Sequence, residues 1–185
     1  MEIINHTPVT KRWSIAAPIP PEINQELADL PPLLRQLLYN RGVRDAETAQ
    51  AFLSASAPEA TDPFLIRDMP QAVELLHAAI TEGTPIAIYG DYDVDGVTST
   101  VLLYELMQKL GVNPRIYIPN RFDEGYGLNL DAVEQLANEG IGLIITVDCG
   151  IRSVEEIALA RRLGMRVILT DHHQPGEILP PADAI

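Results

Sequence analysis

Residues 85–111 read PIAIYGDYDVDGVTSTVLLYELMQKLG, and this stretch predicts the fold. A short apolar run ends at Gly90 and has the composition of a buried strand. A long apolar helix pattern follows, from about Gly96 to Leu110, and Gly111 ends it. Strand and helix are joined by an acidic turn, so side chains that could bind a ligand stand where the strand ends.

The same alternation of strand and helix continues along the chain. A helix is predicted before this stretch, capped by Asp68 and Gln71 and ended by Gly83. Two later helices are predicted to begin at Asn129 and at Ser153, and three more strands have the sequences RIYIP (115–119), IGLIITV (141–147) and RVILT (166–170). Continuous β-branched runs are typical of parallel strands that helices cover on both faces. The predicted class is therefore α/β, with a doubly wound, mainly parallel sheet.

The region before this pattern has a different character. Its many prolines predict an irregular arm over residues 1–31, followed by a short helix at 33–39 and a second one capped by Asp45. The two helices resemble a helix-turn-helix, but this shape is common in plain helical packing, which we favour over a DNA-reading role. We expect an N-terminal region of arm and helices at 1–67 and an α/β domain at 68–185.

Composition restricts the class of protein and its partners. The chain has 185 residues, 46% of them hydrophobic and 21% charged, which is ordinary globular usage. A single cysteine, no signal segment and no run of about 18 apolar residues predict a cytoplasmic protein that does not span a membrane. The net charge is −13, whereas nucleic-acid binders usually carry a basic surface. A nucleic-acid partner therefore requires that cations neutralise clustered carboxylates, or that the basic surface lies elsewhere.

Acids and histidines follow the predicted strands where each strand ends. Parallel strands bring their carboxyl ends to one edge of the sheet, where ligands bind. The side chains expected at that edge are Asp91, Asp93, Asp95, Asn120, Arg121, Asp148, Asp171, His172 and His173. Carboxylates this close would repel one another unless divalent cations lie between them. Mixed carboxylate and imidazole ligands suit Mn²⁺ and similar ions better than Ca²⁺, and paired metals are a common device for cleaving phosphoesters.

Other sites with similar acids fit less well. An EF-hand loop that began at Asp91 would need Glu at its twelfth position, where Leu102 stands, and a helix in place of the preceding strand. A phospho-acceptor receiver domain would leave the pair His172 and His173 unexplained. The sequence also contains neither of the usual glycine-rich nucleotide motifs.

Four segments resemble the motifs of the DHH phosphoesterase family: GDYDVDGVTST (90–100), PNRFDEGYGL (119–128), TVDCG (146–150) and TDHHQPGEILPPADAI (170–185). Within that family they are most similar to the RecJ-type exonucleases. Other branches usually carry a histidine where Tyr89 stands, which favours this one. The resemblance implies 5′→3′ hydrolysis of single-stranded DNA to 5′-mononucleotides, in DNA repair and recombination, with two Mn²⁺ or Mg²⁺ ions. It also implies a monomer whose partners include single-strand-binding protein and a helicase.

The resemblance assigns roles to the residues that match its motifs. Metal ligands would be Asp93, Asp95, Asp148 and His172, with Asp91 as an outer ligand, His173 at the metal or the phosphate, and Asp171 orienting the histidines. Substrate would contact Arg121, Asn120 and Tyr126. Two alternatives stay open: Arg121 could instead pair with Asp123 or Glu124, and Tyr126 could be a packed loop aromatic. Cys149 is expected to be a small buried residue.

RecJ-like sequences continue beyond Ile185, so the resemblance implies an N-terminal fragment that is inactive alone. Two other hypotheses stay open. One is an oligoribonuclease or cyclic-dinucleotide phosphodiesterase of the same superfamily. The other is a non-catalytic scaffold module that kept the fold.

Overall fold

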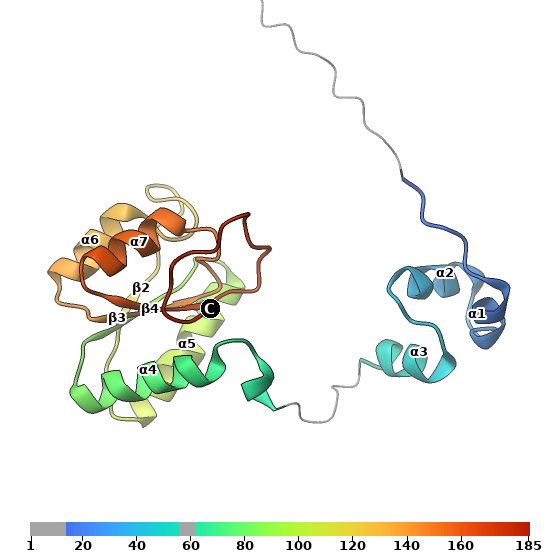
Figure 1. Cartoon of the computed structure of the whole chain (residues 1–185), viewed down its shortest axis with the longest axis horizontal. Coiled ribbons are helices and arrows are strands. Elements are labelled where there is room, and N and C mark those ends of the chain that lie inside the picture. Colours follow the sequence, from blue (N-terminus) through green and yellow to red (C-terminus); the bar gives the residue numbers. More distant parts are fainter. Residues whose placement is uncertain (1–13, 56–61) are drawn as a thin grey trace, which may run out of the picture. The chain divides into compact units, whose positions relative to one another are not determined.

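The computed structural model describes residues 14–55 and 62–185, and Figure 1 shows the whole chain. The chain folds as two compact units, one within residues 1–61 and the other formed by residues 62–185. The finer boundary after residue 67 stays a prediction.

The N-terminal unit contains three short helices around a small core. They are α1 (Pro21–Glu26), α2 (Pro32–Asn40) and α3 (Ala46–Leu53). Asp45 caps α3 as expected, since its carboxylate accepts a hydrogen bond from the Thr48 amide at 2.8 Å. The irregular arm expected over residues 1–31 is wrong for α1, because proline in the first turn of a helix gives up only an amide that has no partner there anyway. Residues 1–13 of that arm lie outside the described residues.

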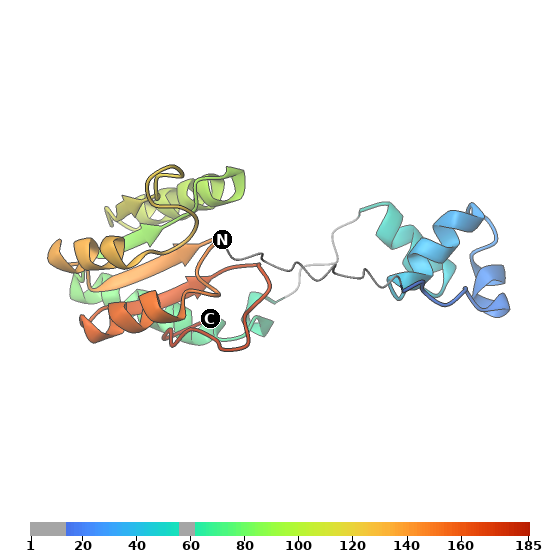
Figure 2. The same cartoon turned by 90° about the horizontal axis from the view of Figure 1, so that it is seen from above.

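The second unit is a parallel α/β domain, as predicted. Its strands are β1 (Ile86–Tyr89), β2 (Arg115–Tyr117), β3 (Leu143–Val147) and β4 (Arg166–Thr170). They pair in parallel in the order β2-β1-β3-β4, and the arrows in Figure 2 point toward one edge. The helical segments are η1 (Pro63–Leu65), α4 (Met69–Glu82), α5 (Val94–Lys109), α6 (Leu130–Asn138) and α7 (Val154–Arg162).

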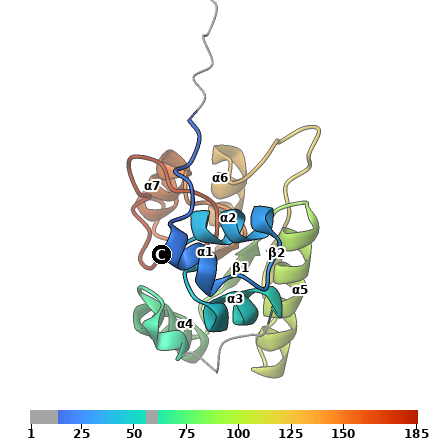
Figure 3. The same cartoon turned by 90° about the vertical axis from the view of Figure 1, so that its right-hand side faces the viewer.

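Helices cover both faces of this sheet. Helices α6 and α7 lie on one face and α4 and α5 on the other (Figures 1 and 3). Side chains of β1 alternate between the two cores: Ala87 and Tyr89 pack toward α6 and α7, whereas Ile86 and Ile88 pack toward α4 and α5. Because both faces are buried, the strands are continuous apolar runs.

Two helices begin differently from the capping pattern of their sequences. Asp68 has a left-handed φ of 55°, and its side chain does not cap α4 but accepts a hydrogen bond from the Ile185 amide at 3.3 Å. Ser153 likewise makes no capping bond to α7. The cap predicted at Asp68 is therefore wrong, and the Ser153 pattern, which is typical of a capping box, does not form one either, because a cap requires a backbone geometry that neither residue adopts.

Helix α5 begins at Val94, two residues earlier than predicted. Asp93 causes the earlier start, since its carboxylate accepts a hydrogen bond from the Gly96 amide at 3.0 Å. An acid of the predicted metal site therefore also caps a helix.

The strand order places a topological switch point between β1 and β3. The chain moves outward from β1 to β2 and, after crossing back, outward again from β3 to β4. Ligands of doubly wound sheets bind at such a point, beyond the carboxyl ends of the strands. Among the described residues, no helix is long and apolar enough to cross a membrane.

Candidate metal centre

Asp148 follows β3 with an unusual backbone. Its φ is 62°, in the left-handed region that non-glycine residues rarely adopt, although Asp tolerates it better than most. The turn redirects the chain at the switch point and leaves the carboxylate buried. Strained backbone of this kind concentrates at functional sites, where the surrounding structure holds it in place.

Asp91 follows β1 and is buried together with the start of α5. Its Oδ1 has no hydrogen-bond partner within the described structure. Gly96 packs directly on the Asp91 backbone, so that a Cβ at residue 96 would overlap with it. Residue 96 therefore has to be glycine for α5 to begin against this turn.

Three carboxylates meet at this point. Asp91, Asp93 and Asp148 each offer one oxygen, and these oxygens lie within 4.8 Å of one another. The pKa of Asp148 is raised, first by burial and then by repulsion from Asp93. The pKa of Asp93 is lowered, because the Gly96 amide donates to its carboxylate. A bound divalent cation would relieve this repulsion and satisfy the unpaired oxygen of Asp91, so the donor set fits such an ion.

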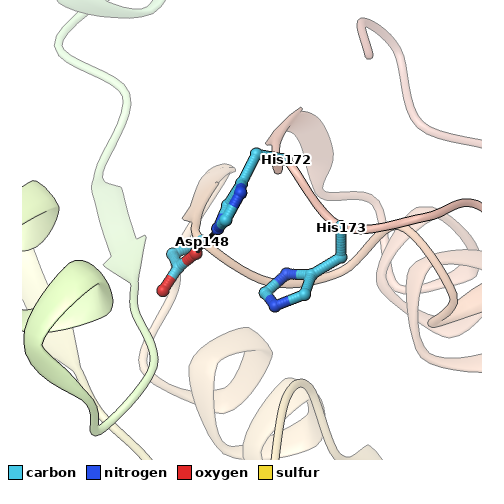
Figure 4. Close-up of side chains that lie close together, drawn as sticks. All are labelled: Asp148, His172 and His173. Carbon is cyan, nitrogen blue, oxygen red and sulfur yellow. Dashed lines mark ion pairs between the residues drawn. The ribbon is translucent and has the colours of Figure 1, made fainter. Parts of the chain in front are cut away.

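The two histidines after β4 lie close to Asp148 (Figure 4). His172 Nε2 lies 2.9 Å from Asp148 Oδ1, and the His172 side chain is 70% exposed. Asp148, His172 and His173 form a second group whose ligand atoms lie within 4.8 Å of one another. Asp148 belongs to both groups and is therefore the residue through which two ions would be linked.

Asp171 connects His173 to the loop before α7. Its Oδ2 accepts a hydrogen bond from the Ile151 amide at 2.9 Å, and its Oδ1 accepts from the His173 amide at 3.0 Å and lies 2.7 Å from His173 Nδ1. Burial favours a higher pKa for Asp171, but these hydrogen bonds outweigh burial and lower it. The same contact raises the pKa of His173. These contacts fix the His173 ring, and the role of Asp171 in orienting both histidines stays a prediction.

Asp95 is the predicted ligand that the structure does not bring into either group. It lies on the exposed first turn of α5, whereas Asp93 caps that turn. Asp95 does border a hollow of about 360 Å³ that Asp148, Asp171 and His172 also line. Asp95 therefore faces the same hollow as Asp148 and His172.

The residues after β2 form an ordered turn beside the site. Asn120 accepts a hydrogen bond from the Phe122 amide at 2.9 Å and so shapes the turn. Arg121 lies over the ring of Tyr92, 4.4 Å from its centroid, where cation–π attraction holds it. Glu124 does not pair with Arg121; its Oε2 accepts a hydrogen bond from the Tyr117 hydroxyl at 2.6 Å.

Tyr92 is the residue that the sequence analysis missed. It stands between two acids in a turn, and a single aromatic there carries no periodic signal. Its edge also meets the ring of Tyr126, with 6.5 Å between the ring centroids.

Tyr126 contacts the framework of the site. Its hydroxyl lies 3.3 Å from the Asp148 carbonyl oxygen, to which it donates, and 3.2 Å from His173 Nδ1. Burial raises the pKa of Tyr126, so the hydroxyl stays protonated near neutral pH. One side of the ring lines a pocket of about 710 Å³ that extends past Asp171 and His173 to the start of α7.

Two further residues have structural roles. Tyr89 is buried, and its hydroxyl donates to the Gly127 carbonyl at 3.1 Å. It therefore fixes the loop that carries Tyr126, and it does not face the acids. Cys149 is buried as expected, and burial raises its thiol pKa so that the thiol stays protonated.

Comparison with known proteins gives the family of the chain. Residues 85–185 match the model of the DHH family, N-terminal domain. The single-stranded-DNA-specific exonuclease RecJ of Bacillus subtilis is 43% identical over 176 residues, which are 94% of this chain and 22% of the relative. The RecJ of Escherichia coli is 45% identical over 159 residues, 85% of this chain and 27% of the relative.

Among solved structures, RecJ from Thermus thermophilus in complex with Mn²⁺ superposes with a TM-score of 0.61 and 30% identity, covering 90% of this chain and 23% of that one. The chain thus spans about a quarter of the length of these relatives.

Proposed function

The chain belongs to the DHH family, and on that premise we propose that it is part of a longer, metal-dependent exonuclease of single-stranded DNA. One observation carries the proposal: three carboxylates and two histidines converge at the switch point, and a buried oxygen of Asp91 has no partner within the described structure. The similarity to single-stranded-DNA-specific exonucleases supports the choice of substrate.

We propose Mn²⁺ or Mg²⁺ as the cofactor, with two ions in the longer protein. Asp91, Asp93 and Asp148 would hold one ion, and Asp148, His172 and His173 the other, with Asp95 at the outer edge. Such ions neutralise charge on the phosphate and make water more acidic. The assignment differs from the one that the family resemblance implied, in that Asp91 and His173 join the ligands and Asp95 is no longer among them.

The residues around the metals would position the DNA. Arg121 has no ion-pair partner among the described residues, and stacking on Tyr92 leaves its planar set of N–H donors available to a phosphate. Tyr126 would keep the Asp148 backbone and His173 in place through its hydroxyl. Its exposed ring borders the pocket where a base could lie.

The proposal also covers the direction and products of the reaction, its cellular setting and its partners. The enzyme would degrade DNA in the 5′→3′ direction and release 5′-mononucleotides, in repair and recombination in the cytoplasm. It would act as a monomer with single-strand-binding protein and a helicase as partners. The 185 residues would have little activity alone, because they align to about a quarter of the relatives and carry a charge of −13. A basic DNA-binding surface would then lie in the rest of the protein.

The test uses the longer protein and single-stranded DNA labelled at either end. With Mn²⁺, the 5′ label should appear as a mononucleotide from the start, whereas the 3′ label should stay on shortening strands. Asp148→Asn should abolish the reaction, and Asp123→Asn, which changes an exposed acid outside both ligand groups, should not. Equal activity of all three proteins would overturn the proposal, and cleavage of dinucleotides alone would point to a different substrate.

A further inference from the structure

An open apolar groove runs between α4 and α5. Each helix contributes one stripe of residues at the spacing of a single helix face, Met69, Ala72, Val73 and Leu76 from α4 and Ser99, Leu102, Leu103 and Leu106 from α5. The floor comes from β3 and β4, through Ile145, Val147, Ile168 and Thr170. The groove has a volume of about 620 Å³, and among the described residues that line it only Glu105 and Lys109 are charged.

The apolar side chains on the walls are unusually exposed. Val73 is 46% exposed, Leu102 74% and Leu106 48%. Helix α5 also exposes Val97 and Val101, and the exposed Leu110 follows it directly. Contiguous exposed apolar patches of this kind mark an interface.

The end of the chain lies beside α4, the helix that forms one wall of the groove. Asp183 and Ala184 run parallel to β4 and pair with it through the Ile168–Ala184 bridge. Gln71 of α4 donates a hydrogen bond to the Asp183 carbonyl, and the Ile185 amide donates to Asp68 just before α4. A polypeptide that continues past Ile185 would therefore leave from beside α4.

We infer that the groove is an intramolecular docking site, covered by the polypeptide that follows Ile185 in the longer protein. The inference rests on the proposed function in one respect, that the chain is part of a protein about four times as long. The segment would be an amphipathic helix whose apolar residues recur at i, i+3, i+4 and i+7, because two helical walls and a sheet floor receive such a stripe. An acidic or basic segment would find few partners in this nearly uncharged groove.

Thiol labelling tests the inference without using nuclease activity. The chain has one cysteine, Cys149, which is buried. Leu102→Cys places a reactive thiol on the α5 wall, and Val73→Cys gives an independent probe on the α4 wall. Leu163→Cys is the matched control, since Leu163 is 45% exposed and follows α7 on the opposite face of the sheet. Each variant is prepared in the 185-residue chain and in the longer protein, and labelling is followed by peptide mass spectrometry.

In the 185-residue chain all three thiols should react quickly. In the longer protein, Leu102→Cys and Val73→Cys should react at least about tenfold more slowly, while Leu163→Cys keeps its rate. Equal rates for the groove thiols in both proteins would overturn the inference. Slow labelling already in the 185-residue chain would overturn it as well. If the labelling rate of the groove thiols in the 185-residue chain also falls as the protein concentration rises, the occupant is a second copy of the chain. These rates do not depend on whether the longer protein cleaves DNA.

Discussion

Asp148 combines a strained backbone, burial and a neighbouring carboxylate, and each of these raises the energy of the metal-free chain. Its raised pKa means that folding favours the protonated form. The stabilisation is full below the ordinary pKa of Asp and is lost as the pH rises through the folded pKa. At neutral pH, the charged carboxylate therefore lowers the free energy of unfolding.

Asp148→Asn should accordingly raise the melting temperature of the metal-free chain at about pH 7, and raise it less at about pH 4. Asn is a suitable replacement because it also tolerates the left-handed backbone. The same variant should no longer gain stability from Mn²⁺, whereas the parent chain gains about 2.7 kcal/mol at a hundredfold excess over Kd. Thermal unfolding with EDTA or Mn²⁺ measures both effects. Asp123→Asn, with its acid outside both ligand groups, should show neither, and a Mn²⁺ response of Asp148→Asn would contradict the assignment.

Gly96 matters because of its contact with the Asp91 backbone. In Gly96→Ala the new Cβ overlaps with backbone atoms, which cannot move away as a side chain can. The expected loss in the free energy of unfolding is about 1–3 kcal/mol, measured by urea denaturation. Gly176→Ala is the control, since the nearest atom to its Cβ would be 3.8 Å away. Equal stability of the two variants would show that the turn relaxes around the methyl group.

At the scale of elements, the two helices over one face of the sheet differ in how they begin. Asn129 caps α6 by accepting a hydrogen bond from the Ala132 amide at 2.7 Å. Ser153 precedes α7 without such a bond. Asn129→Ala should lower the free energy of unfolding by about 1 kcal/mol, and Ser153→Ala by much less. Chemical denaturation of both variants compares them, and a larger loss for Ser153→Ala would contradict the assignment of the caps.

Much of the fold at this scale follows from the sequence. The four strands, α2, α3 and α6 were predictable because apolar runs and Asn129 or Asp45 caps act locally. The caps at Asp68 and Ser153 were not, since the backbone at those residues is set by tertiary contacts such as the bond from Ile185 to Asp68. The convergence of acids and histidines was predictable from parallel strand ends, because topology alone brings them together. The stacking of Arg121 on Tyr92 and the bonds of Tyr126 depend on loop packing, which leaves no periodic pattern in the sequence.

At the scale of the whole molecule, the ligand groups lie entirely within the second compact unit. Residues 62–185 should therefore fold alone and bind Mn²⁺ with an affinity within about threefold of that of the whole chain. Titration calorimetry on both proteins measures this. A large loss of affinity on deleting residues 1–61 would show that the N-terminal unit contributes to the site.

The three hydrogen bonds of Asp171 restrain His173 but not the adjacent His172. A rotamer change of His173 would break its bonds to Asp171 and Tyr126, and Asp171 in turn is tied to the loop before α7. His172 contacts Asp148 and the ring of His173, with 4.6 Å between the two ring centroids, and its side chain is largely exposed. Ligand entry can therefore reorient His172 without breaking a hydrogen bond to Asp171, whereas a displacement of the His173 ring would disturb Asp171 and the loop before α7.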